Sequence, residues 1–159
     1  MAVQSSRTIS TSELVRFGVS LIDHAADITQ DEGRTEPLVF GTVMAYNNDD
    51  QQWVPWTEVD ATDGESIPAG IYVGDTIAAA ELVAGDAVDV PILNGGWCVI
   101  DSHKIVFDGD LDLDTVVNAT NEAATTPEVV DYMEVAAWQV LKWHGIHVED
   151  TVNISAAQA

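Results

Sequence analysis

Residues 51–75, QQWVPWTEVDATDGESIPAGIYVGD, constrain the fold more than any other part of the chain. The run WVPW at 53–56 combines aromatic and β-branched side chains, which favours a strand, and its proline indicates a sheet edge or a bulge. The polar residues that follow contain Asp63-Gly64, a strong turn signal. A second strand pattern resumes at 69–74. This stretch therefore predicts two short strands joined by a turn-rich connection, and nothing in it resembles an active site.

Other β-rich runs flank this stretch, at 37–46, 90–93, 97–100, 104–107 and 146–154. The two runs 90–93 and 97–100 are separated by Asn-Gly-Gly, and Asn-Gly between apolar runs predicts a hairpin. Many short strands with turn signals between them are typical of a small barrel or sandwich. The sequence predicts a mainly β domain of the α+β class, shaped like a small β-barrel or β-sandwich.

One longer helix is expected at 127–143. Pro127 suits a first helical position, Glu128 complements the helix dipole, and Gly145 suits the position just after the helix. Apolar residues recur along the segment at helical spacing, as expected of a helix that covers one face of a sheet.

The first 36 residues differ from the remainder. The first twelve are small and polar, and the charged run 31–37 is interrupted by Gly33 and Pro37. A short helix or an extended segment could follow Ser10. We expect residues 1–36 to form an extended N-terminal arm and residues 37–159 to form the β-rich domain.

Charge is the unusual feature of the composition, with 27 acidic and 5 basic residues giving a formal net charge of −22. Direct binding to nucleic acid requires clustered Lys and Arg, so the charge argues against it. No apolar run approaches the roughly 18 residues that span a bilayer, so no membrane association is expected. The single cysteine, Cys98, cannot form an intrachain disulfide.

Signatures of catalysis and of metal binding are absent or incomplete. There is no phosphate-binding glycine loop, no HExxH and no Gly-x-Ser-x-Gly. The acidic run 108–114 alternates like a calcium loop but lacks the glycine and glutamate of an EF-hand. His144, His147 and Glu149 lack a further convergent ligand. We expect no enzyme activity, no catalytic residue, no cofactor and no metal.

Four pieces of sequence carry a family resemblance through their shared order and spacing. They are LVFGTV at 38–43, WVPW at 53–56, ATDG at 61–64 with AGI at 69–71, and HGIHV at 144–148. This pattern resembles the head decoration proteins of lambda-like tailed bacteriophages, over about residues 37–152. The segment 107–126 departs from the family by being longer and more acidic, which suggests an insertion.

The resemblance implies a structural virion protein. Such a protein assembles as a homotrimer on the outer surface of the phage head and stabilises the expanded capsid by bridging subunits of the major capsid protein. Weak contacts made by three linked copies would then add through effective concentration. The alternative suggested by the acidity is a DNA-mimic inhibitor of a basic nucleic-acid-binding protein.

Two sets of residues are expected to form the interfaces. For the capsid we expect residues of the arm to make contact, because its first 16 residues carry two bases and only one acid and because the arm could order on docking. These are Arg7, Leu14, Val15, Arg16 and Phe17. For the trimer we expect aromatic anchors, which are enriched at interfaces. These are Trp53 and Trp56, together with Pro55, although both tryptophans would equally suit a core.

Overall fold

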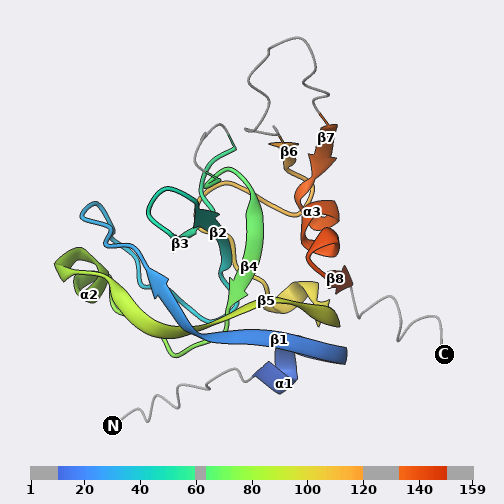
Figure 1. The fold of residues 1–159 in the computed structure, drawn as a ribbon, viewed down its shortest axis with the longest axis horizontal. Coiled ribbons are helices and arrows are strands. Elements are labelled where there is room, and N and C mark those ends of the chain that lie inside the picture. Colours follow the sequence, from blue (N-terminus) through green and yellow to red (C-terminus); the bar gives the residue numbers. More distant parts are fainter. Residues whose placement is uncertain (1–10, 60–63, 120–132, 150–159) are drawn as a thin grey trace, which may run out of the picture.

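The computed structural model describes residues 11–59, 64–119 and 133–149 of the 159-residue chain. Five strands close into a barrel (Figure 1). Around the barrel they are β1 (Val15–Ile28), β3 (Gln52–Pro55), β2 (Val43–Asn47), β4 (Pro68–Tyr72) and β5 (Ala87–Asp101), and β5 pairs with β1 to close the ring. The predicted mainly β, barrel-like fold is thereby confirmed.

The remaining elements are short and lie around the barrel. Strand β8 (Ile146–Glu149) extends the sheet by pairing in parallel with the C-terminal end of β5, while β6 (Val116–Ala119) and β7 (Met133–Ala136) form a separate two-stranded sheet. The helices are α1 (Thr11–Leu14), α2 (Ala79–Ala84), α3 (Ala137–Trp143) and the 3₁₀ turn η1 (Ser102–Lys104). Figure 1 shows α3, β8 and the N-terminal end of β1 on the same side of the molecule.

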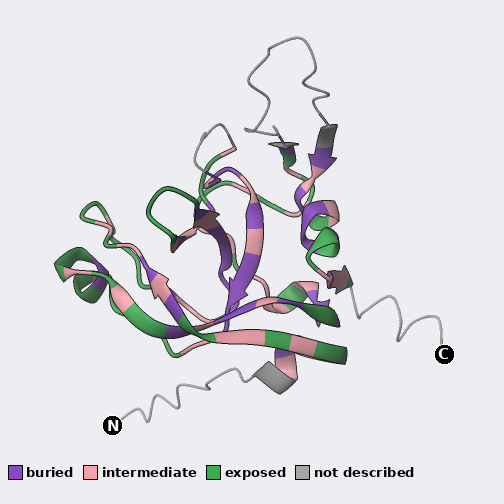
Figure 2. Cartoon of the chain, viewed as in Figure 1, coloured by how far each residue is buried: buried purple, intermediate pink, exposed green. Residues whose placement is uncertain are grey.

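Strand β2 explains why the predicted strand 37–46 reads as a nearly continuous apolar run. Met44 points into the barrel, where it packs with Trp53. Val43 and Ala45 point the other way, into a second cluster that includes Val140 of α3. Both faces of β2 are therefore buried (Figure 2), and a strand covered on both faces needs apolar side chains at every position.

The predicted arm is wrong for residues 15–28. These residues form β1, which pairs antiparallel with β5 from Val15–Ile100 to Ile28–Ala87. Ile28 is fully buried in the barrel core. The hydrogen-bonded ladder to β5 makes this segment part of the domain, so a boundary at residue 36 does not separate an arm from a body.

The predicted hairpin at Asn94-Gly95-Gly96 is also wrong. The chain does not reverse at these residues but continues as one fifteen-residue strand, β5. Leu21 pairs with Gly95 and Ile22 with Leu93, which leaves Asn94 as the extra residue of a β-bulge. The glycines bend the strand instead of reversing it.

The predicted helix 127–143 is confirmed only for Ala137–Trp143. Residues 133–136 form β7 and pair with β6, and 127–132 lie outside the described residues. Val135 and Val117 are buried together with Ala137 in one cluster. Burial of these side chains in a two-stranded sheet overrides the helical pattern of the sequence.

Candidate interaction surface

The five residues predicted to bind the capsid have different environments. Leu14 is fully buried, and Val15 packs against the same core cluster, so neither side chain faces a partner. Arg16 lies half exposed and bonds to Asp101. Phe17 is largely exposed. Arg7 lies outside the described residues. Of the predicted set, Phe17 is the side chain that the structure leaves available for contact.

The expectation that Trp53 and Trp56 are exposed trimer anchors is wrong. Trp53 packs inside the barrel, edge-on to Tyr46 with ring centroids 5.3 Å apart. Trp56 is fully buried on the other side of β2 and donates its indole N–H to the carbonyl oxygen of Ser66 at 3.0 Å. Pro55 is half-buried between them. These two indoles stabilise the core and cannot reach another subunit.

The exposed apolar side chains gather instead on the outer face of β1 and β5, here called the sheet face. Its members and their exposed fractions are Phe17 (63%), Val19 (71%), Leu21 (60%) and Trp97 (54%). Alternate residues of a strand share one face, and Val19 lies directly opposite Trp97 in the ladder. The Phe17 and Trp97 rings meet edge-to-face at 5.6 Å.

A second group of exposed aromatic side chains lies on α3, here called the helix side. It consists of Trp138 and Trp143, exposed by 37% and 57%, with Lys142 between them in sequence. Trp138 and Lys142 line a small hollow together with His147 and Glu149 of β8. His147 also contacts Trp97 edge-on at 5.9 Å. His147 therefore links the sheet face to the helix side, and the two form one continuous surface, the aromatic end.

Close backbone contacts hold the three strands of the aromatic end together. Gly96 has a φ of +94°, and a Cβ there would overlap the carbonyl oxygen of Val19 on β1. Gly145 has a φ of +83°, and a Cβ there would overlap the carbonyl oxygen of Gly96. Both conformations favour glycine. These glycines allow β1, β5 and β8 to present Trp97 and its neighbours on a single surface.

A charged cluster anchors the start of β1 beside the sheet face. The buried carboxylate of Asp101 accepts hydrogen bonds from Arg16 Nη2 at 2.7 Å and from the backbone N–H of His103 at 3.0 Å. Burial by itself would raise the pKa of Asp101, but these bonds and the charge of Arg16 lower it to about 2.

Acid should weaken this cluster. A depressed pKa in the folded state contributes stability above the unfolded value of about 4, and that stability is lost as the pH falls toward about 2. Asp101→Asn should lower the free energy of unfolding by about 1 kcal/mol at pH 7, because the half-exposed Arg16 is partly screened by water. Urea denaturation at pH 7 and near pH 2 should show this difference shrinking in acid. The exposed Asp110→Asn is the control, and an equal difference at both pH values would contradict the assignment.

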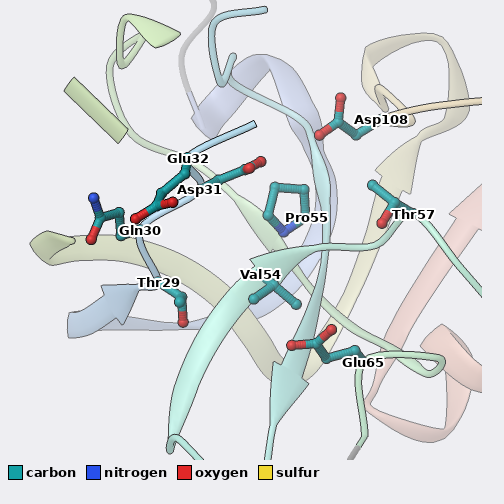
Figure 3. Close-up of a pocket in the computed structure, with 9 residues that line it drawn as sticks. All are labelled: Thr29, Gln30, Asp31, Glu32, Val54, Pro55, Thr57, Glu65 and Asp108. Carbon is teal, nitrogen blue, oxygen red and sulfur yellow. The ribbon is translucent and has the colours of Figure 1, made fainter. Parts of the chain in front are cut away.

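A separate hollow, lined by residues of β3 and of several loops, is strongly acidic (Figure 3). Val54, Pro55 and Thr57 form part of its wall, and carboxylates surround them. These acids are Asp31, Glu32, Glu65 and Asp108. Arg34 is almost fully buried nearby and pairs with Asp108 at 2.6 Å, which ties two loops together. We assign this hollow no ligand.

The described residues offer no catalytic or metal-binding arrangement. In the described ranges, no three His, Cys, Asp or Glu side chains converge as metal ligands. Cys98 is fully buried, and burial raises the pKa of its thiol, which makes it a poor nucleophile. Among the same residues, no helix is both long and apolar enough to span a membrane.

Comparison with known proteins does not identify the chain. It matches no protein-family model, no curated protein and no solved structure. The functional argument therefore depends on the aromatic end itself.

Proposed function

We propose that this protein is a head decoration protein of a tailed bacteriophage. It binds the outer surface of the capsid as a homotrimer and stabilises the expanded head by bridging subunits of the major capsid protein. It has no enzymatic role and acts on the virion surface.

The observation that carries this proposal is the aromatic end. Soluble monomers rarely expose large contiguous apolar patches, and such patches mark sites of protein interaction. Here four exposed apolar side chains of the sheet face connect through His147 to Trp138 of α3, and Trp143 is exposed on the same helix. A protein that cements a shell needs contact surfaces rather than chemistry, and this arrangement suits it.

The residues that resemble decoration proteins support the same proposal. Their central part covers most of β3 and β4 and the first residue of β2, which are neighbouring strands of the barrel. The Ala69-Gly70-Ile71 segment lies within β4, where a Cβ on Gly70 would crowd the side chains of Ile92 and Trp53. Most of the resemblance therefore rests on residues that build the barrel, and its last piece, 144–148, includes His147 of the aromatic end.

The DNA-mimic alternative has weaker support. A mimic of the DNA backbone needs regularly spaced acids over an extended face. The acids around the hollow of Figure 3 instead come from three separate loops, at 31–32, 65 and 108. We retain it only as the next hypothesis if shell binding fails.

Cosedimentation with expanded, DNA-free shells of the parent phage tests the proposed function. The full-length chain should pellet with expanded shells, saturate at a fixed ratio to capsid protein, and raise the temperature at which the shells disrupt. A truncation at residue 36 would remove β1 and unfold the barrel, so the intact chain is needed. A chain that stays in the supernatant at every concentration would refute the proposal.

A further inference from the structure

The aromatic end has two differently oriented faces. Strand β8 pairs with β5 on one edge, and the hollow shared with α3 lies beside it. The sheet face lies on the outer side of β1 and β5, whereas Val140 and Leu141 bury the opposite side of α3 in the core. The helix side and the sheet face therefore meet at His147 of β8, which lines the hollow with Trp138 and contacts Trp97, and they form one corner of the surface.

The aromatic end is poor in acids compared with the whole chain. Among the residues that define it, the charged side chains are Lys142 and Glu149, with His147 between the two faces, and the neighbouring Arg16 is paired with Asp101. The whole chain carries a net charge of −22. Two copies of such a protein repel each other over most of their surfaces, so an acid-poor apolar corner is where they can approach closely.

We propose that the aromatic end is the contact between copies of this chain, with the sheet face of one protomer packed against the helix side of the next. Different surfaces then meet at each contact, and such contacts close into a ring when the rotation between copies allows it. Two apolar faces that meet at a corner suit a small closed ring, because each protomer fills one wedge around the axis. The number of copies, three, rests on the proposed function.

This arrangement explains why both faces are apolar. A two-fold dimer would bury one self-complementary patch on each copy. If that patch were a single face paired with its own copy, the dimer would leave the other face open to water, either the sheet face, with Phe17 and Trp97, or the helix side, with Trp143. A ring removes both the sheet face and the helix side from water, while the acidic hollow stays outside the contacts.

Solution mass measurements with paired variants test the contact. The wild-type chain should sediment at three times its mass of 17.1 kDa. Val19→Asp on the sheet face and Trp143→Ser on the helix side should each raise the dissociation constant by about thirtyfold, the effect of losing one interface hot spot. Val88→Asp is the matched control, because Val88 is also exposed on a strand but lies at the other end of β5. All three side chains are exposed, so none of the variants should unfold.

Mixing the two impaired variants separates this contact from a two-fold contact between like faces. Val19→Asp keeps an intact helix side and Trp143→Ser keeps an intact sheet face, so together they should form one-to-one dimers that neither forms alone. A wild-type monomer at the highest soluble concentration, unchanged mass in both variants, or a mixture that gains no dimers would overturn the proposal. A monomer that still binds shells would overturn this inference and the homotrimer but leave the proposed shell binding standing, whereas a trimer that ignores shells would overturn the proposed shell binding alone.

Discussion

Replacing Trp56 with alanine is expected to lower the free energy of unfolding by about 4 kcal/mol. Trp56 is fully buried between β2 and the α3 region, so its removal leaves a large cavity. The substitution also takes away the N–H that bonds to the carbonyl oxygen of Ser66 at 3.0 Å. An edge-on contact with Phe107, at 6.1 Å between ring centroids, is lost as well.

The matched comparison is Trp97→Ala. Trp97 is more than half exposed, so the same substitution should cost about 0.5 kcal/mol of stability. Its main effect should fall on association between copies. Urea denaturation followed by far-ultraviolet circular dichroism measures both variants without relying on tryptophan fluorescence. Similar losses of stability in the two variants would show that the division between core and surface tryptophans is wrong.

Gly145→Ala is expected to destabilise the protein by at least about 3 kcal/mol. The residue has a φ of +83°, and an added Cβ would overlap the carbonyl oxygen of Gly96. Its own carbonyl oxygen accepts the N–H of Cys98 at 3.0 Å, a bond that joins β8 to β5. Any shift that relieves the overlap therefore pulls β8 away and disturbs the aromatic end.

Substitutions at two other glycines distinguish the two causes of the stability lost in Gly145→Ala, which are backbone strain and overlap of the added Cβ. Gly109 also has a positive φ, +97°, but nothing lies within 4 Å of its added Cβ, so Gly109→Ala should cost about 1 kcal/mol from backbone strain alone. Gly85 has an extended backbone and open space around it, so Gly85→Ala should stay within about 0.5 kcal/mol of the wild type. Thermal and urea denaturation of the three variants should rank them in this order. Equal losses at Gly109 and Gly145 would contradict the proposed backbone overlap.

The proposed contact between copies also has a defined salt dependence. The contact is apolar, and the bodies of the copies repel each other through their net charge of −22. Salt shortens the range of that repulsion to about 8 Å at physiological ionic strength. Association should therefore strengthen with added salt, whereas a contact held together by ion pairs would weaken.

Local patterns in the sequence determined much of the β-structure. The run WVPW and the strand pattern after Pro68 can be recognised from neighbouring residues alone, and they correspond to β3 and β4. The predicted turn at Asp63-Gly64 lies partly outside the described residues. The mainly β class and the C-terminal part of the helix follow from the same periodicities. The charge, which argues against direct nucleic-acid binding, is likewise a property of the composition alone.

The tertiary structure decided which segments pair and which side chains remain exposed. Residues 15–28 became a barrel strand because β5, some seventy residues later, supplies its partner, and no local pattern encodes that pairing. Trp53 and Trp56 look equally suited to an interface or a core in the sequence. Both are buried because the barrel covers one side of β2 and α3 covers the other. Trp97, Trp138 and Trp143 are left exposed because no described element covers the outer side of β5 or of α3. Burial depends on what packs against a strand or helix from distant parts of the chain, so only the folded structure could locate the surface on which the proposed function rests.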